Sequence, residues 1–229
     1  MQVVLTPELL IEAYRQGLFP MSYGADSPYV HWVCPEQRGQ LSIENLHISK
    51  SLKKAIRKNL NGHNGYRVKT NTAFEETMRA CAQSSDNRPE TWINEHIIEA
   101  YCKLHARGVA HSVECWDGNV LIGGLYGVSI GGAFFGESMF SRKPNASKIA
   151  LVHLCARLWH AGYQLLDTQF INDHLLTFGA YEIDHEVYIQ KLTGVLSLEV
   201  SFECHDMPEK KLIEQYLTMR SDRKTVIEQ

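Results

Sequence analysis

Apolar residues recur at helical spacing in two segments near the start of the chain. Over residues 7–16 they form one side of a predicted helix, with Thr6 suited to cap its start and Gly17 to end it. Over residues 49–60 a narrower apolar stripe runs among basic residues, which predicts a second amphipathic helix. The stretch between them, residues 17–39, is rich in Pro, Gly and aromatic residues and predicts an ordered but irregular segment.

The rest of the chain alternates between helical and strand patterns. Thr72 and Glu75 have the spacing of a capping box, and Asn94 precedes a further helix that Gly108 ends. The Asp-Gly pair at 117–118 is typical of a tight hairpin turn. The elements that follow are predicted as strands at 109–116, 120–130 and 133–140, a helix at 147–160, a strand at 165–170 and a short helix at 172–178. This order predicts an α+β or α/β domain with a mixed sheet.

Small and polar residues at 61–65 indicate a linker that divides the chain. We therefore predict a small N-terminal domain over residues 1–62, which holds the basic helix, and a larger domain over residues 63–205. The remaining residues, 206–229, are predicted to form a charged tail with a helix from Glu209 to Met219.

The composition is that of an ordinary globular protein: of 229 residues, 44% are hydrophobic and 21% are charged. No apolar run approaches the roughly 20 residues that span a membrane, and the first residues lack the basic start of a secretory signal. The six cysteines form no CxxC pair and are predicted to be reduced thiols in the core. We therefore expect a cytoplasmic protein without membrane contact, and we expect a monomer.

The distribution of charge along the chain is more informative than the net charge. A net charge of −3 argues against a general nucleic-acid binder, but residues 50–69 contain seven basic residues and no acidic one. These residues are Lys50, Lys53, Lys54, Arg57, Lys58, Arg67 and Lys69. The run suits contact with RNA phosphates, and the pattern alone favours a solvated helix face equally.

Polar side chains interrupt two segments that otherwise have the pattern of buried strands. Glu137 lies in the first, residues 136–142, and Asp167 and Gln169 lie in the second, residues 166–174. Burying a carboxylate without a partner is costly, so buried polar groups are usually paired or functional. Since one predicted helix separates the two segments, we expect them to line one cleft.

These two segments, GESMFS and LLDTQF-x-NDH, resemble the leucyl/phenylalanyl-tRNA–protein transferases. Further elements follow in the family's order: AYRQGLFP at 13–20, WVCPEQR at 32–38, TWI at 91–93, EAY at 99–101, HSVE at 111–114 and GGLYGV at 123–128. The chain departs from the family pattern at Met21, Val33 and Gln37, where many members carry Trp, Trp and Pro. It also starts close to the first motif, whereas other members have a longer leader.

The resemblance implies a GNAT-like acyltransferase domain with a mixed, mostly antiparallel sheet over residues 63–205. It implies transfer of Leu or Phe, with Met as a further donor, from aminoacyl-tRNA to proteins that start with Arg or Lys, which marks them for degradation. The α-amine of the acceptor attacks the aminoacyl ester and the ribose hydroxyl leaves. Because the ester is already activated, this reaction requires no metal, ATP or other cofactor.

Asp167 and Gln169 are two residues apart on a predicted strand, so their side chains face the same side. The Gln169 amide oxygen can accept a hydrogen bond from an attacking amine, and Asp167 can hold or polarise Gln169. The resemblance places a catalytic pair at these two positions. From the sequence alone, the favoured alternative is that Asp167 satisfies nearby backbone or caps the next helix.

Further residues are expected to contact the substrate, and the resemblance assigns one of them, Glu137, to the aminoacyl-adenosine. Glu137, Tyr14, Trp92 and Asn172 are expected to bind the aminoacyl-adenosine, with the two aromatic rings stacking on the adenine. For Glu137 the alternative is a buried ion pair with Arg142, and for the rings it is ordinary packing. The predicted donor side-chain pocket consists of Leu125, Phe134, Met139, Phe170 and Ile171. The predicted tRNA phosphate contacts are Lys50, Lys53, Lys54, Arg57 and Lys58.

Two other classes of protein remain as alternatives. An acetyl-CoA-dependent acetyltransferase on the same fold would need a glycine-rich pyrophosphate loop, and the loop at residues 142–147 lacks those glycines. A non-catalytic tRNA-binding module would need the basic helix without the polar cluster.

Cys102 and His105 are at helical spacing, but nothing near them completes a metal site. No GxSxG, GxGxxG or P-loop motif is present.

Overall fold

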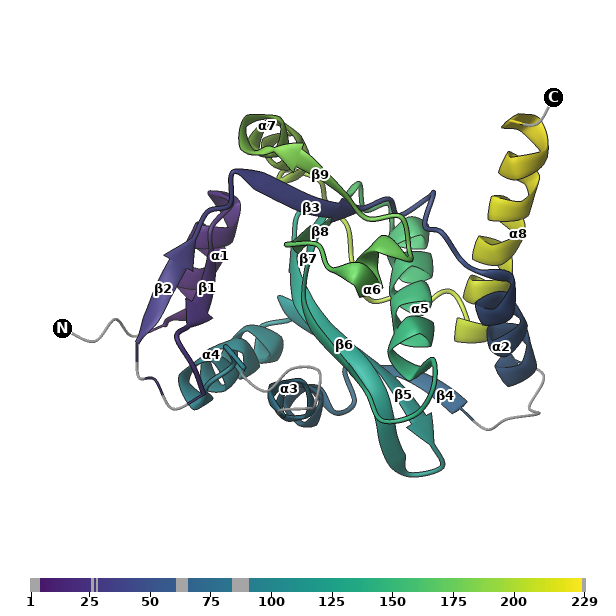
Figure 1. The fold of residues 1–229 in the computed structure, drawn as a ribbon, viewed down its shortest axis with the longest axis horizontal. Helices are drawn as coiled ribbons and strands as arrows, with labels where there is room; N and C mark the ends of the chain where they lie inside the picture. The colour runs from purple at the N-terminus through teal and green to yellow at the C-terminus, as the bar shows by residue number, and fades with distance from the viewer. Residues whose placement is uncertain (1–4, 26, 28, 61–65, 84–90, 228–229) are drawn as a thin grey trace.

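The structure, a computed structural model, describes residues 5–25, 27, 29–60, 66–83 and 91–227, with side chains described as far as Met219 (Figure 1). The strands are β1 (Phe19–Ser22), β2 (Val30–Val33), β3 (Gln37–Leu41), β4 (Tyr66–Thr70), β5 (Ala110–Asp117), β6 (Val120–Ile130), β7 (Ala133–Ser141), β8 (Leu165–Gln169) and β9 (Tyr181–Asp184). The helices are α1 (Pro7–Arg15), α2 (Lys50–Leu60), α3 (Phe74–Ala82), α4 (Glu95–Ala106), α5 (Ala146–Ala161), α6 (Asp173–Leu176), α7 (His185–Val195) and α8 (Glu209–Ile227).

A mixed sheet forms the centre of the molecule. Its strand order is β4-β5-β6-β7-β8-β3-β9, and β1 and β2 form a separate antiparallel hairpin. Neighbouring strands of the large sheet pair antiparallel except β7 and β8, which pair parallel. Helix α5 connects these two strands, as a parallel crossover requires. The α+β class with a mixed, mostly antiparallel sheet is therefore confirmed.

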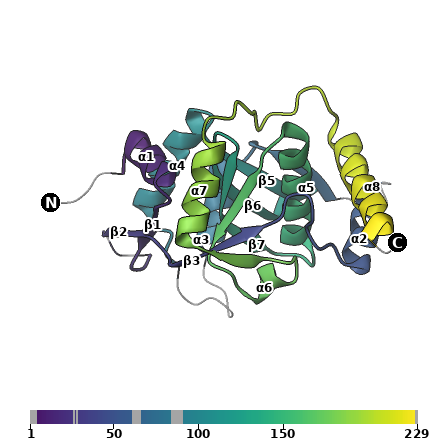
Figure 2. The same ribbon diagram turned by 90° about the horizontal axis from the view of Figure 1, so that it is seen from above.

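Helices cover both faces of the sheet and bury two apolar cores. Helix α5 packs on β5, β6 and β7 from one side and contacts α2 and α8, whereas α3 and α4 pack on the other side, where α1 contacts α4. Figure 2 shows α2 and α8 beside α5 at one end of the molecule, with α1 and the β1–β2 hairpin at the other. Helix α5 is apolar on nearly all sides because neighbours surround it, and residues 146–158 are buried apart from Lys148.

Local signals place several helix ends correctly. The Thr6 hydroxyl accepts a hydrogen bond from the Leu9 amide (3.2 Å), and the Asn94 side chain accepts one from the Ile97 amide (2.9 Å). Gly118 has a φ of +60° in the tight turn between β5 and β6, a conformation that suits glycine. The helices predicted from these caps and the hairpin predicted from the Asp-Gly pair are confirmed.

The prediction of an irregular segment over residues 17–39 is wrong. It forms β1, β2 and the start of β3, and these strands have only four or five residues each. β3 pairs with β8 and β9, more than 120 residues away in the chain, which a local pattern does not reveal. β3 lies within the large sheet although it precedes residue 62, and the division there stays a prediction. The predicted linker at 61–65 lies outside the described residues.

The capping box at Thr72 and Glu75 is also wrong. Helix α3 starts at Phe74 without a side-chain cap, and Glu114 of β5 instead binds the two residues that precede the helix. Its fully buried carboxylate accepts hydrogen bonds from the Thr72 amide (2.9 Å) and the Ala73 amide (2.8 Å), and also from the Thr72 hydroxyl. These donors satisfy the carboxylate without a cation. Strands β4 and β9 and helix α7 were not predicted, although residues 66–70 alternate as a strand does.

The cysteines are free, as predicted, but they do not all lie in the core. Cys81, Cys115 and Cys155 are buried, whereas Cys34 is exposed and Cys102 and Cys204 are partly exposed. Among the described residues no helix is both long enough and apolar enough to cross a membrane. Within the same residues no three His, Cys, Asp or Glu side chains are grouped so that they could hold a metal ion.

Candidate active site

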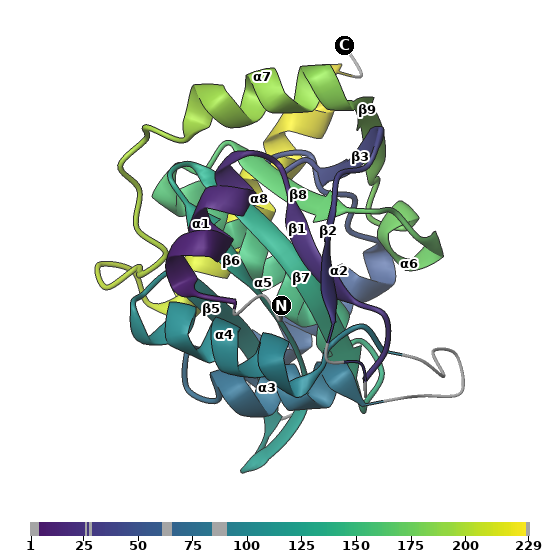
Figure 3. The same cartoon turned by 90° about the vertical axis from the view of Figure 1, so that its left-hand side faces the viewer.

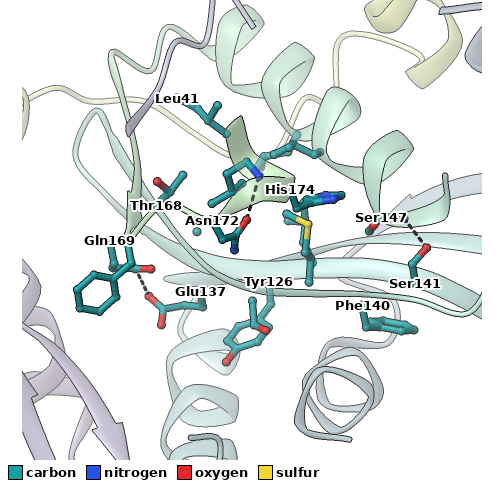
Figure 4. Close-up of a pocket in the computed structure, with 18 of the residues that line it drawn as sticks. Leu41, Tyr126, Glu137, Phe140, Ser141, Ser147, Thr168, Gln169, Asn172 and His174 are labelled. Atoms are coloured by element: carbon teal, nitrogen blue, oxygen red, sulfur yellow. Dashed lines mark hydrogen bonds between the residues drawn. The ribbon is translucent and has the colours of Figure 1, made fainter. Parts of the chain in front are cut away.

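A cavity of about 750 Å³ opens where β7 and β8 cease to pair (Figure 4). The parallel pairing ends at Phe135 and Asp167, and residues that follow on both strands line the cavity. The other walls come from the β1–β2 hairpin, from the Trp92 segment, and from helices α3, α5 and α6. The two polar segments predicted to share a cleft are thus brought together.

Glu137 lies at the centre of a hydrogen-bond cluster on β7. Its Oε1 accepts hydrogen bonds from the Tyr14 hydroxyl (2.7 Å) and from Gln169 Nε2 (3.0 Å). Its Oε2 accepts one from the Tyr101 hydroxyl (3.4 Å), and the two tyrosine hydroxyls also bond to each other. Figure 4 shows Glu137 and Gln169 pointing toward one another. Arg142 instead donates to the Leu121 carbonyl and to Gln83, so the alternative of a Glu137–Arg142 ion pair is wrong.

This environment changes the acidity of Glu137. Removal from water raises its pKa from 4.5 to about 7, because burial disfavours the charged form more than the hydrogen bond from Tyr14 favours it. Burial and the nearby Glu137 charge raise the pKa values of Tyr14 and Tyr101 well above the usual 10, so both hydroxyls remain protonated. Glu137 therefore exchanges a proton near neutral pH, next to an open cavity.

Asp167 is fully buried and forms an ion pair with Arg38. Arg38 Nη2 donates to Asp167 Oδ2 (2.8 Å) and Nε donates to Oδ1 (3.0 Å), while Nη1 donates to the Gly17 carbonyl (2.7 Å). The Tyr188 hydroxyl also donates to Asp167 Oδ2 (2.7 Å). Arg38 and Tyr188 had no predicted role, although Arg38 ends the WVCPEQR motif that carries the family resemblance.

Gln169 ends β8 in an unusual backbone conformation. Its φ is +57°, which a residue other than glycine adopts at a cost of about 1–3 kcal/mol. The Gln169 amide donates to Asp167 Oδ1 (2.8 Å), which stabilises this turn, while its side chain reaches Glu137. Asp167 thus holds Gln169 by accepting from its main chain, which agrees with the alternative that Asp167 satisfies nearby backbone, and a catalytic role of the pair stays a prediction. Gln169 lines the cavity, and Asp167 supports it from behind.

The residues predicted to bind the aminoacyl-adenosine divide into two groups. Trp92 and Asn172 line the cavity, and the Asn172 side chain also caps α6 by accepting from the Leu175 amide (2.9 Å). Tyr14 is completely buried and its ring packs against Phe135, with centroids 4.8 Å apart. The prediction that Tyr14 stacks on adenine is therefore wrong, and its contact with the site is the hydrogen bond to Glu137.

The structure brings together only some of the residues predicted to form the donor side-chain pocket. Leu125, Met139 and Phe170 line the cavity. Phe134 and Ile171 do not: Phe134 is completely buried and stacks on Phe202, with ring centroids 5.7 Å apart, and Ile171 packs against the same core. The apolar lining that was not predicted includes the leucines Leu41, Leu151, Leu154, Leu166 and Leu175. Two of these lie on α5, whose pattern is apolar on all sides and so does not show which residues face a cavity.

Two buried polar atoms of cavity-lining residues have no hydrogen-bond partner within the described part of the chain. They are the Thr168 hydroxyl and His174 Nε2. Burial, and to a smaller degree the charge of Lys148, lowers the pKa of His174, so its ring is neutral at pH 7. A ligand with polar groups can satisfy both atoms.

The basic residues predicted to contact RNA phosphates lie on α2. Lys50, Lys54, Arg57 and Lys58 are exposed and Lys53 is half-buried, while Leu52 and Ile56 anchor the helix in the core next to α5. Helix α2 lies on the far side of α5 from the β1–β2 hairpin (Figure 1). Phosphate binding by this surface stays a prediction.

Comparison with known proteins agrees with this geometry. The family described as leucyl/phenylalanyl-tRNA protein transferase matches residues 40–193, and its N-terminal domain matches residues 4–36. A protein named leucyl/phenylalanyl-tRNA–protein transferase from Paramagnetospirillum magneticum is 49% identical over 199 residues, covering 87% of this chain and 93% of that protein. Proteins of the same name from Hyphomonas neptunium and Maricaulis maris are 51% and 50% identical, covering 86% of this chain and 74% and 89% of those proteins. The chain therefore belongs to the leucyl/phenylalanyl-tRNA protein transferase family.

Proposed function

We propose that this protein transfers Leu or Phe from aminoacyl-tRNA to the N-terminal amine of an acceptor protein. The observation that carries the proposal is the cluster of Glu137 and Gln169 at the edge of an apolar cavity. The names of its relatives support the same reaction. By family membership, we extend the proposal to acceptors that start with Arg or Lys, to marking them for degradation, and to a cytoplasmic location.

Glu137 and Gln169 can act together on the attacking amine. The acceptor nitrogen forms a bond to the ester carbonyl carbon, and the bond to the ribose oxygen breaks. Glu137, with a pKa of about 7, takes a proton from the amine and returns one to the departing ribose oxygen, which leaves as a hydroxyl. Gln169 Nε2 is engaged by Glu137, which leaves its amide oxygen to accept a hydrogen bond from the amine and orient it.

In this mechanism Asp167 is a positioning residue. Its carboxylate is occupied by Arg38, Tyr188 and the Gln169 amide, and it does not line the cavity. The contacts with Arg38 hold the Asp167 carboxylate in place, so that the left-handed turn at Gln169 is held. The side chain of Gln169 is then directed at Glu137 before any substrate binds.

The rest of the cavity accounts for the donor. Leu125, Met139, Leu151 and Leu154 offer an apolar space for a side chain that is unbranched at Cβ, such as Leu, Phe or Met. Trp92 stacks on the terminal adenine, and Asn172 contacts the adenosine. The exposed basic residues of α2 bind phosphates of the tRNA body.

The decisive experiment is transfer of labelled Leu from charged tRNA to a peptide that starts with Arg. A peptide that starts with Asp and an acetylated Arg peptide serve as acceptor controls, and acetyl-CoA replaces the charged tRNA in a parallel reaction. We expect label only on the free Arg peptide and only with charged tRNA. Acetylation without Leu transfer would favour the acetyltransferase alternative, and tRNA binding without any transfer would favour a binding module.

A further inference from the structure

We propose that the inner face of the β1–β2 hairpin, ending in the rings of Tyr23 and His31, binds the single-stranded nucleotides that precede the terminal adenosine of the donor RNA. This inference rests on the proposed function, because it concerns the same RNA. The hairpin forms a sheet of its own at one end of the molecule (Figure 1), with β1 and β2 side by side (Figure 3). Its strands pack partly against the core, whereas Tyr23 and Tyr29, between the two strands, are exposed.

The register of the hairpin defines a continuous face that begins in the cavity. Phe19 pairs with Val33 and Met21 pairs with His31, and directly opposed residues of an antiparallel pair project from the same face. Phe19 and Met21 line the cavity. The face that carries these side chains therefore leads out of the cavity toward His31.

Two stacked rings extend this face into solvent. The ring of Tyr23, two residues after Met21, lies on the imidazole of His31, with centroids 4.4 Å apart and planes inclined by 29°. Tyr23 is 73% exposed, and nearby Tyr29 is 67% exposed. Exposed flat rings at the edge of a binding site suit stacking of unpaired bases, which is typical of single-stranded RNA recognition.

The hairpin is held in place and joined to Trp92. The Ser22 amide donates to the Trp92 carbonyl (3.3 Å), and Asn94 Nδ2 donates to the Ser22 hydroxyl (3.1 Å) and to the Ser27 carbonyl (2.7 Å). The ring of Phe19 also meets Phe170 edge-on, with centroids 5.7 Å apart. Because Trp92 is the proposed adenine contact, the next nucleotides emerge beside the hairpin onto a surface that is already ordered.

The absence of carboxylates on the two strands favours RNA over the acceptor peptide as the ligand of this face. Residues 19–22 and 30–33 include no Asp or Glu, so the two strands do not repel phosphates and offer no carboxylate to a peptide that starts with Arg or Lys. Helix α2 lies at the opposite end of the molecule (Figure 2). It would therefore meet a more distant part of the tRNA than the last nucleotides.

The test compares three donors that carry the same amino acid: aminoacyl-adenosine, an aminoacyl trinucleotide with the tRNA 3′-terminal sequence, and full aminoacyl-tRNA. Tyr23→Ala and His31→Ala are each expected to lower kcat/KM on the order of tenfold for the trinucleotide and for tRNA, and to leave aminoacyl-adenosine unchanged. Tyr23→Phe keeps the ring and should retain normal values. Tyr181→Ala removes another exposed tyrosine, on β9, and serves as the matched control.

Other outcomes would overturn the proposal. Equal loss with all three donors would assign the rings to the cavity itself, and unchanged kinetics with all three would leave them no role in RNA binding. An altered KM for the acceptor peptide alone would make this face a peptide surface. If the unaltered protein transfers no amino acid from any donor, the proposed function fails first, and filter binding of the trinucleotide to Tyr23→Ala and to the unaltered protein still tests the hairpin.

Discussion

Glu137→Gln is the sharpest perturbation of the proposed mechanism. Gln has nearly the same shape as Glu and can keep a hydrogen bond from Tyr14 through its amide oxygen, but it cannot accept a proton. We expect transfer to fall by about 10²-fold or more, the usual contribution of a positioned proton-transfer group. The variant thus separates the proton-transfer role of Glu137 from its packing.

The pH dependence follows from the same group. With a pKa of about 7, roughly half of Glu137 is ionised at pH 7 and about 1% at pH 5, so transfer should rise with pH across this range. The acceptor amine, whose usual pKa is about 7.7–8.0, adds to the rise. Single-turnover transfer from aminoacyl-adenosine measures the chemical step without tRNA binding. The Glu137→Gln variant should lose the rise centred near pH 7 and keep that of the amine.

Ionisation of Glu137 with rising pH should lower the stability of the fold, although it should raise the rate of transfer. An unfolded Glu ionises near its usual pKa of 4.5, whereas folded Glu137 resists ionisation until about pH 7, so folding becomes less favourable as pH rises between these values. The difference between the folded and unfolded pKa of Glu137 lowers the free energy of unfolding by ~3 kcal/mol above pH 7. This loss of stability disappears below about pH 4. Urea unfolding should therefore show Glu137→Gln to be more stable than the unaltered protein at pH 8, with little difference at pH 4. A variant that keeps near-normal transfer, or is less stable at pH 8, would refute this reasoning.

Three further predictions concern other parts of the site. Gln169→Ala should lower transfer by roughly 10²-fold at little cost in stability. Asp167→Ala should lower transfer as much and also destabilise the fold by about 3–5 kcal/mol, because it leaves Arg38 buried without its partner. Transfer assays and urea unfolding together distinguish the two variants. Replacing the basic residues of α2 with Ala should weaken tRNA binding and reduce the log–log salt slope by about one unit or less per phosphate contact, and an unchanged slope would make α2 a solvated face. Leu154→Ala should shift donor use from Leu toward Phe by enlarging the cavity, and Lys should be rejected in both proteins; equal transfer of Leu and Lys in a competition assay would place the donor pocket elsewhere.

The sequence alone was sufficient for elements whose signals are local. Thr6 and Asn94 predicted helix starts because a cap needs only the amides two or three residues away. The Asp-Gly pair predicted the β5–β6 turn for the same reason. Ordered motifs over most of the chain also indicated the family, and with it the polar cluster of Glu137, Asp167 and Gln169, since those motifs contain the residues themselves.

Only the tertiary structure decided features that depend on distant partners. β3 is a short strand stabilised by β8 and β9, so its own five residues carry little signal. Thr72 was expected to cap α3, but its hydroxyl and its amide, together with the Ala73 amide, donate to Glu114 of β5 instead. A capping pattern describes what a side chain can reach nearby, whereas folding selects whichever partner packing brings closest.

Distant partners also decide which residues of the site line the cavity and which lie in the core. The pattern of apolar residues could not separate Phe134, which lies in the core, from Leu154, which lines the cavity, because both are simply buried in an apolar segment. Nor could it show that Tyr14 supports Glu137 instead of facing the ligand. The pKa of Glu137 depends on how completely its neighbours exclude water. Residue type and spacing therefore determined which chemistry was available, and long-range packing determined which groups face the cavity and in what state of ionisation.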